Sequence, residues 1–301
     1  MDDRRLVRGG LLALVSWAAL SCMSWIGSPA WAGGPNEGKA TPPAQAASDS
    51  KPAAESPKPA SGPPQPKPGE HPLMPVLRWG QESLKIAEKI QDYSATMVKR
   101  ERIDGKVQDT EYMFIKVRHN PLSVYMYFLK PDHFRGREVI WIRDQNDGKM
   151  WAHDVGMRKV FGTVKLDPTG PVAMKGNLYP ITETGVLNLV RRLIEEGEKD
   201  TKYGECEVKY FQGAKINGRS STCIQITHPI PRRNFQYHIA RIFVDDELNL
   251  PVRFEAHDWP STTGGPPELI LEYTYLNIKM NNGFTDADFD IRNPAYGFRS
   301  K

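Results

Sequence analysis

The chain has 301 residues, a formal net charge of +4 and three cysteines. Its 40 lysines and arginines are nearly balanced by 36 aspartates and glutamates, so the charge does not predict a nucleic acid as partner. Residues 72–301 are long enough for one sizeable domain with its own core, and no second linker-like segment divides them.

The first 32 residues have the pattern of a secretion signal. Three arginines precede an apolar run over residues 11–26, and the sequence SPAWA ends it with small residues at the positions that signal peptidases recognise. A membrane anchor is the alternative, but serines interrupt the run, which is short for a span of about 20 residues. Lipid attachment at Cys22 ranks below cleavage after Ala32, because Ala19 occupies the position that is usually leucine in lipoprotein signals. We therefore expect export to the periplasm or cell envelope, with no transmembrane span after cleavage.

Residues 33–71 consist mainly of proline, alanine, serine, glycine and lysine. Such a segment cannot bury enough apolar surface to offset the entropy lost on ordering, which predicts a disordered linker. A single domain over residues 72–301 should follow it. We expect residues 1–70 to be dispensable, so that a chain beginning near His71 still unfolds cooperatively.

The domain begins with a helix-like pattern. Leu73, Leu77, Gly80, Leu84 and Ala87 recur at spacings of four and three residues, which places them on one face of a helix. This face should pack on a sheet.

Residues 93–118 alternate with a period of two around the sequence DG at 104–105, which predicts a hairpin with a two-residue turn. In that register Ala95 and Met97 face Phe114 and Tyr112, and the other side is partly apolar as well. Both faces should therefore be covered, one by helices and the other by more chain or a ligand.

Nine further strand-like segments follow at short intervals, separated by turn sequences such as NDGK and ING. One interior helix interrupts them after Pro180, with Thr182 as the expected N-cap and Gly197 as the expected end. The predicted fold class is α+β, mainly β: a consecutive series of antiparallel strands with an N-terminal helix and one interior helix.

The connection before the interior helix, residues 166–185, is rich in proline and glycine. Its apolar residues Met174, Leu178 and Tyr179 allow two interpretations. The segment is either a movable cover over the sheet, with glycines as hinges, or a rigid loop whose apolar residues complete the core.

Cys206 and Cys223 remain after signal cleavage, and an oxidising compartment favours their pairing. A two-residue turn at 217–218 would instead place Cys206 opposite Pro229 and Cys223 opposite Gln212, with the sulfurs far apart. A bulge would change this pairing, so the sequence leaves both the disulfide and two free thiols open.

The sequence contains no phosphate-binding loop, no nucleophile elbow, no His-Glu-x-x-His and no Cys-x-x-Cys, which lowers the expectation of an enzyme. Three weaker clusters remain. Asp286, Asp288 and Asp290 have calcium-loop spacing but lack its glycine and final glutamate, so a surface turn with Phe289 packed inward is favoured. The His-Asp pairs at 153–154 and 257–258, with the histidines at 228 and 238, could form a metal or catalytic site, but scattered His and Asp on alternating strands usually mark the solvated face, and this alternative is favoured.

The third cluster is basic and aromatic, within HPIPRRNFQYHIAR. Arginine forks bind carboxylate or phosphate and aromatic rings suit a lipid boundary, so an anionic headgroup or an acidic partner could dock here. A solvated hairpin tip is the alternative interpretation. The candidate residues for this anionic site are Arg232, Arg233, His238 and Arg241.

Several stretches, among them LDPTGPVAMKGNLYPITETG, VDDELNLPVRFEAHDWP and DADFDIRNPAYGF, resemble the bacterial exported family catalogued as domain of unknown function 1571 (DUF1571). The resemblance covers nearly all of residues 73–298. More distantly, the order of elements resembles the LolA-like periplasmic carriers. That resemblance implies a strongly curved, unclosed antiparallel sheet whose concave face, with its covering helices, holds acyl chains.

The sequence and these resemblances predict a non-enzymatic binding protein that carries or senses an amphiphile or a lipoprotein in the cell envelope, without cofactor or metal. An envelope hydrolase and a purely structural envelope component are the alternatives. A lipid or lipoprotein acyl chain, and an envelope protein, are the expected partners. Aromatic residues on one concave surface could hold such a chain. The predicted ligand-binding residues are Met97, Tyr112, Phe114, Tyr125, Tyr127, Trp141 and Trp151.

Overall fold

The computed structural model describes residues 67–298, except for the side chains of Arg158 and Lys159. The predicted secretion signal, the lipid-attachment alternative at Cys22 and most of the predicted linker lie outside the described residues. At the start of the described part, Glu70 forms an ion pair with Arg78 at 2.7 Å, and His71 Nε2 lies 2.8 Å from the carbonyl oxygen of Tyr203. The last residues of the predicted linker thus already contact the domain.

Residues 67–298 form three α-helices and one antiparallel sheet of twelve strands, which confirms the predicted fold class. The helices are α1 (Met74–Ala87), α2 (Pro171–Met174) and α3 (Val186–Asp200). The first group of strands is β1 (Asp92–Ile103), β2 (Lys106–Val107), β3 (Glu111–His119), β4 (Leu122–Lys130), β5 (Glu138–Ile142), β6 (Met150–His153) and β7 (Thr163–Leu166). The second group is β8 (Glu207–Ile216), β9 (Arg219–Thr227), β10 (Ile239–Asp245), β11 (Pro251–Asp258) and β12 (Glu268–Met280).

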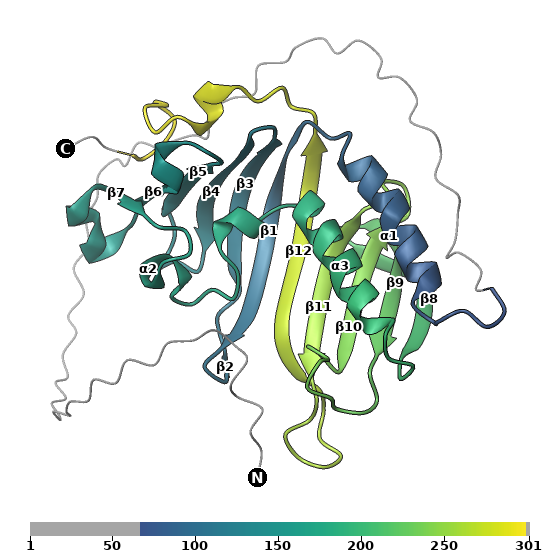
Figure 1. Cartoon of the computed structure of the whole chain (residues 1–301). Helices are drawn as coiled ribbons and strands as arrows, with labels where there is room; N and C mark the ends of the chain where they lie inside the picture. Colours follow the sequence, from purple (N-terminus) through teal and green to yellow (C-terminus); the bar gives the residue numbers. More distant parts are fainter. Residues whose placement is uncertain (1–66, 299–301) are drawn as a thin grey trace, which may run out of the picture. The chain divides into compact units, whose positions relative to one another are not determined.

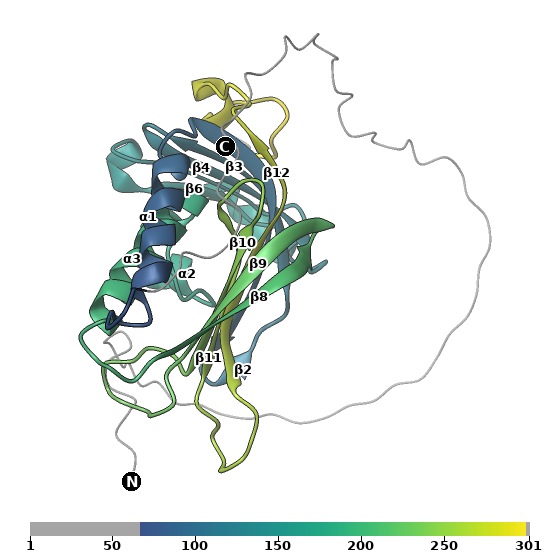
Figure 2. The ribbon, with the colours of Figure 1, turned by 90° about the vertical axis from the view of Figure 1, so that its right-hand side faces the viewer.

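The sheet consists of two meanders joined in the middle. Its order is β7-β6-β5-β4-β3-β1-β12-β11-β10-β9-β8, with β2 paired to the end of β1 (Figure 1). The first and last strands of the domain are therefore the central pair. The edge strands β7 and β8 are not paired with each other, so the sheet is unclosed, and it is strongly curved when seen from the side (Figure 2).

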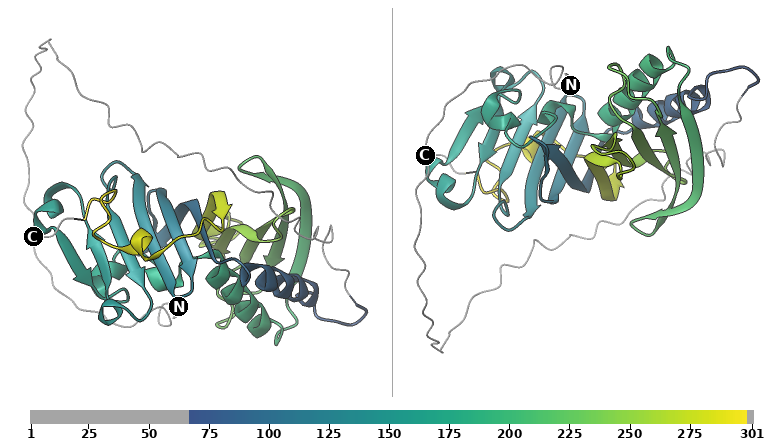
Figure 3. Two further views of the ribbon diagram at one scale, coloured as in Figure 1. Left: turned by 90° about the horizontal axis from the view of Figure 1, so that it is seen from above. Right: turned by 90° about the horizontal axis from the view of Figure 1, so that it is seen from below.

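This topology explains the long connection between the meanders. After β7 the chain must reach β8 at the opposite edge, ten strand spacings of about 4.8 Å away. Residues 167–206, which we call the crossover, make this passage on the face of the sheet that α1 also covers (Figure 3). The first part of the crossover, residues 167–185, is called the cover segment below.

The two helices of this face are in close contact through glycines. A Cβ atom on Gly197 of α3 would lie 2.9 Å from Leu77 of α1, and one on Gly80 of α1 would lie 3.1 Å from Ile194 of α3. The predicted apolar face of α1 is thus confirmed, with Gly80 as its contact point. The prediction that Gly197 ends the interior helix is wrong. Gly197 lies inside α3, where a larger residue would push the two helices apart.

The expected N-cap of the interior helix is also wrong. Thr182 lies in a short 3₁₀ turn, Ile181–Glu183, and α3 begins only at Val186. Gly185 precedes it with φ = +124°, a conformation that favours glycine. The Tyr93 hydroxyl of β1 accepts the hydrogen bond from the Val186 amide at 2.9 Å, so a tyrosine from the sheet caps the helix.

The register of the first hairpin differs from the prediction by one residue. Near the turn Arg102 pairs with Val107 as expected, but farther along Met97 pairs with Met113 and Thr96 with Phe114. The extra residue lies between β2 and β3. Because side chains alternate along a strand, this shift places Tyr112 and Phe114 on the face opposite to Met97.

Both faces of the first meander are covered, as predicted. The crossover and helices cover one face, and residues 284–298 of the chain itself cover the other. On that outer face Phe289 is 2% exposed and packs against Tyr125 and Ile140. The expectation that Phe289 packs inward is therefore confirmed.

Cys206 and Cys223 are free and buried, which settles the open question of the disulfide. A bulge in β8 places Cys223 opposite Phe211, so the two cysteines are not cross-strand neighbours. Burial raises the pKa of the Cys206 thiol to about 12 and that of Cys223 to about 11. Both thiols are therefore expected to be unreactive at neutral pH.

Candidate functional site

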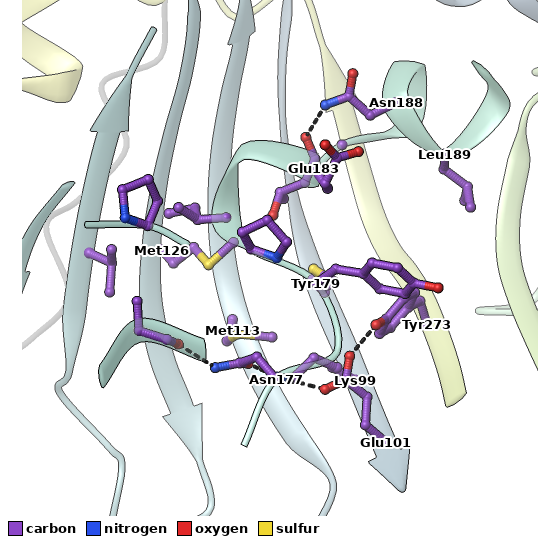
Figure 4. A pocket seen from close by; sticks show the side chains of 18 of the residues that line it. Lys99, Glu101, Met113, Met126, Asn177, Tyr179, Glu183, Asn188, Leu189 and Tyr273 are labelled. Carbon is purple, nitrogen blue, oxygen red and sulfur yellow. Dashed lines mark hydrogen bonds and ion pairs between the residues drawn. The ribbon is translucent and has the colours of Figure 1, made fainter. Parts of the chain in front are cut away.

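A pocket of about 150 Å³ lies between the sheet and the crossover (Figure 4). Its floor comes from the inward-facing residues of β1, β3, β4, β5 and β6, and β11 and β12 contribute to one side. Its roof comes from the cover segment and the first residues of α3. Because the crossover passes over the sheet between its two edges, the topology itself places this roof over the floor.

The floor of the pocket is rich in methionine. Four methionines from four strands of the first meander line it, and all four are buried. Methionine side chains are unbranched and polarisable, and they adapt to apolar groups of different shapes. This surface therefore suits a flexible hydrocarbon better than a rigid ligand. The four residues are Met97, Met113, Met126 and Met150.

One end of the pocket is polar. Glu101 on β1 is 3% exposed, and its carboxylate accepts hydrogen bonds from the Leu178 amide at 3.1 Å and from the Tyr273 hydroxyl. Lys99, two residues earlier on the same face, donates to the side-chain oxygen of Asn177 and lies 3.5 Å from Glu101. We call these five residues the polar anchor.

The polar anchor joins the cover segment to the sheet. Asn177 and Leu178 belong to the cover segment, whereas the other three anchor residues belong to β1 and β12. Lys99 also forms an ion pair with Glu111 of β3 at 3.2 Å. A buried carboxylate and a buried ammonium are costly unless paired and hydrogen-bonded, and each of these two has several partners.

The C-terminal end of the cover segment is fixed to the same strand. Tyr93 of β1 accepts the Val186 amide, and the side chain of Asn188 donates to the carbonyl oxygens of Thr182 and Thr184 at 3.2 Å. Tyr93 and Glu101 both project from the inward face of β1. β1 therefore holds the cover segment at two points, at residues 177–178 and at its C-terminal end, and Met97 of the floor lies between the two attachment residues of this strand.

An arginine and a tyrosine stand at the mouth of the pocket. Arg192 of α3 lies over the ring of Tyr179 at 4.1 Å, and Tyr179 in turn contacts the ring of Tyr273. Arg192 lies 3.9 Å from Glu183, with 39% of its side chain exposed. Arg192 is thus a cation that lines the pocket and is also partly exposed to solvent.

The predicted ligand-binding residues do not share one face. Met97 lines the pocket, and Trp141 is buried on the same side of the sheet with its indole N–H 3.2 Å from the Gly148 carbonyl oxygen. The other five lie on the outer face, because the hairpin register differs by one residue and because strand alternation carries that difference into β4 and β6. They are Tyr112, Phe114, Tyr125, Tyr127 and Trp151.

The outer aromatic residues of β4 and β6 pack under the C-terminal segment. Tyr125 stacks on Tyr296 with ring centroids 4.2 Å apart, and Lys116 lies 5.5 Å from the centre of the Tyr296 ring. Lys116 also forms an ion pair with Asp288 at 2.8 Å. This face is closed by the protein's own chain, so the assumption of one concave aromatic surface is wrong.

The four residues of the predicted anionic site have separate partners. Arg232 forms an ion pair with Glu205, whereas Arg241 lies on the outer face of β10 and pairs with Glu255 at 2.7 Å. His238 Nδ1 lies 2.8 Å from the carbonyl oxygen of His228. Arg233 is exposed on the same loop as Arg232. The structure does not bring these four side chains together.

The histidines and aspartates considered for a hydrolase do not form one site either, although backbone hydrogen bonds make His228, His238 and His257 neighbours. Asp154 pairs with Arg137 at 3.0 Å, and His228 is stacked on Phe235 with ring centroids 3.9 Å apart. Of the aspartates with calcium-loop spacing, Asp288 pairs with Lys116 and Asp290 with Arg292. Within residues 67–298, no group of three or more His, Cys, Asp or Glu side chains is placed to hold a metal ion.

Asp200, at the end of α3, makes one buried contact with a testable pH dependence. It lies 3.4 Å from His228 Nε2 and accepts a hydrogen bond from the Tyr237 hydroxyl at 3.1 Å. Burial raises the pKa of Asp200 from its usual 3.8 to about 6, and burial lowers the pKa of His228. At neutral pH the imidazole is therefore uncharged and does not offset the buried carboxylate.

We expect Asp200→Asn to stabilise the protein above pH 6. The pKa of Asp200 is higher in the folded than in the unfolded protein, so protonation of Asp200 stabilises the fold. This contribution to the free energy of unfolding, up to about 3 kcal/mol, is lost as the pH rises from about 4 to 6. The amide keeps an acceptor for Tyr237 without the charge. Urea unfolding should show the variant to be more stable than the parent at pH 7.5 and equal to it at pH 4. A variant that is less stable at pH 7.5 would show that the charge is stabilising.

Comparison with known protein families finds one family model that matches the sequence. The model described as "Protein of unknown function (DUF1571)" matches residues 90–298. No curated protein matches the sequence. None of the helices within residues 67–298 has the length and apolarity needed to cross a bilayer.

Several solved structures have a similar arrangement of strands. They include a putative outer membrane lipoprotein-sorting protein domain from Vibrio parahaemolyticus (12% identity, 71% of this chain and 95% of that chain covered, TM-score 0.34). Lipoprotein LppX of Mycobacterium tuberculosis is similar at 16% identity (71% and 98% covered, TM-score 0.34). A LolA superfamily protein from Nitrosomonas europaea is similar at 12% identity (70% and 97% covered, TM-score 0.29). Likenesses this weak carry no ligand or activity over to this chain.

Proposed function

The chain belongs to the DUF1571 family, and we propose that it is an exported, non-enzymatic binding protein that holds the apolar part of an amphiphile between the sheet and the cover segment. The observation that carries this proposal is the pocket itself. It combines a buried methionine floor, a polar end and a roof that one strand holds at two points. The amphiphile is either a free lipid or the acyl chain of a lipoprotein.

The size of the pocket indicates how it works. An apolar cavity of about 150 Å³ holds a ligand the size of benzene, and pockets for drug-sized ligands measure roughly 300–1,000 Å³. A long acyl chain therefore does not fit in the closed arrangement. The cover segment must move away from the floor to admit one, and the polar anchor is the contact that such a movement breaks first.

The polarity of the lining supports an amphiphile rather than a purely apolar ligand. Lys99 and Glu101 are occupied by each other and by the cover segment, whereas Arg192 reaches solvent at the mouth. A bound chain could thus lie on the methionines while an anionic headgroup meets Arg192. Each buried methylene would contribute about 0.8 kcal/mol.

Native mass spectrometry of the exported protein tests this function directly. We expect a lipid mass that organic solvent removes, and a delipidated protein that binds a fluorescent fatty acid. Met126→Gln should weaken that binding about tenfold or more, because an amide placed against a hydrocarbon chain loses its hydrogen bonds with water.

Met280→Gln is the matched control, because Met280 is partly buried in the same core but does not line the pocket. It should bind the fatty acid as the parent does. Protein that carries no lipid and binds no fatty acid after delipidation would contradict the proposed function. Equal weakening by both variants would move the binding site away from the pocket.

A further inference from the structure

Exposed apolar side chains are concentrated near one edge of the sheet. Eight large apolar side chains within residues 67–298 are exposed, and four of them fall between residues 157 and 172. Single exposed apolar residues need no explanation, but a group of them on one short segment marks an interaction site. These four are Met157 (94% exposed), Val160 (77%), Phe161 (62%) and Val172 (70%).

The four residues flank the edge strand β7. A 3₁₀ segment, η2 (Gly156–Phe161), precedes β7 and carries three of them, and α2 follows β7 and carries Val172. In Figure 1, β7 lies at the outer end of the sheet, with α2 toward the middle. The next residue after Val172, Ala173, lines the pocket. This surface, which we call the edge patch, is thus continuous in the chain with the roof of the pocket.

The edge patch has a positive charge. Residues 156–176 contain two lysines with exposed positions, Lys165 and Lys175, and the sequence adds Arg158 and Lys159 between the exposed apolar residues. Their one carboxylate, Asp167, accepts hydrogen bonds from the amide and hydroxyl of Thr169, both at 2.8 Å. Over residues 156–176 the sequence thus carries four cations and one acid, and that acid is already hydrogen-bonded.

We propose that the edge patch docks on an anionic lipid bilayer, with Met157, Val160 and Phe161 inserted at the headgroup boundary. Apolar side chains interleaved with cations are the pattern of segments that lie in a membrane interface, where each inserted group and each headgroup contact adds affinity. A protein-binding surface of standard size would need about 800 Å² per partner, far more than one short 3₁₀ segment offers.

Docking at this edge would bring the roof of the pocket to the bilayer. This step extends the proposed function, since an amphiphile could then pass between the bilayer and the pocket without crossing water. The docking itself does not depend on the pocket, so the two can be tested separately.

Vesicle flotation of the chain without residues 1–32 tests the proposal. We expect binding to vesicles that contain phosphatidylglycerol, weaker binding to phosphatidylcholine alone, and release at high salt. Val160→Ser with Phe161→Ser should lower the partition coefficient about tenfold or more, because burying two such side chains is worth several kcal/mol. Phe211→Ser, an exposed apolar residue (49%) on the other edge strand, should change nothing.

A label at the patch distinguishes insertion from indirect binding. Met157→Cys can carry an environment-sensitive fluorophore, since the two cysteines of the domain are buried. Its emission should be quenched by lipids with a nitroxide on the acyl chain. Vesicle binding that the double serine variant retains, a label that such lipids leave unquenched, or a parent that does not bind anionic vesicles would overturn the proposal. Fatty-acid binding in solution by the double serine variant should equal that of the parent.

Discussion

Glu101→Ala should lower the free energy of unfolding by about 3–5 kcal/mol and release the cover segment. Removal of one partner of a buried ion pair costs this much because the remaining groups lose their partner in a dry environment. Here the Leu178 amide and the Tyr273 hydroxyl both lose their acceptor, and Lys99 loses one of its two carboxylates. Urea unfolding gives the loss of stability, and hydrogen exchange of residues 167–185 gives the release.

Glu111→Ala is the control for this prediction. Glu111 of β3 is the other carboxylate beside Lys99, and its ion pair is with this lysine of β1 and not with the cover segment. Its removal should cost less and leave the exchange of residues 167–185 unchanged. If the backbone amides of the cover segment exchange as slowly in Glu101→Ala as in the parent, the segment is a rigid part of the core. An amphiphile would then need another entry route to the pocket.

The architecture was predictable from the sequence because its patterns are local. The period of α1 and the alternation along the strands depend on neighbouring residues, and burial of the apolar positions follows from them. The hairpin register was not predictable, because the extra residue between β2 and β3 falls in the polar sequence QDT, which carries no alternation to mark it. One such residue moved Tyr112 and Phe114 to the opposite face.

The site was only partly predictable for the same reason. Met97 is among the predicted ligand-binding residues and lines the pocket. The cover segment is also a predicted candidate, because it is a glycine-rich connection that contains apolar residues. Lys99 and Glu101 were missed, although a signal exists. They continue the inward alternation of Ala95 and Met97, where a lysine and a glutamate need buried partners. Their partners are remote in sequence: the crossover brings Asn177 close, and the pairing of β12 with β1 places Tyr273 opposite Lys99.

The largest effect on the core is expected from Trp141→Ala. Trp141 is 7% exposed on the inward face of β5, where it packs in the same cluster as the methionines but does not line the pocket. Its truncation should lower the free energy of unfolding by about 3–5 kcal/mol, as for other buried aromatic residues. At a temperature at which the variant is fully folded, its affinity for a fluorescent fatty acid should equal that of the parent.

Phe114→Ala provides the comparison from the outer face. Phe114 is only partly buried there, so its truncation should cost less than that of Trp141 and should likewise leave fatty-acid affinity unchanged. The measurement is urea unfolding of both variants beside a titration of the folded proteins. A Trp141→Ala protein that is nearly as stable as the parent but binds the fatty acid clearly more weakly would show that the bound acyl chain extends beyond the pocket lining to Trp141. The pocket would then open toward Trp141 when the cover segment moves, and the tryptophan would be a contact of the ligand instead of a support for the floor.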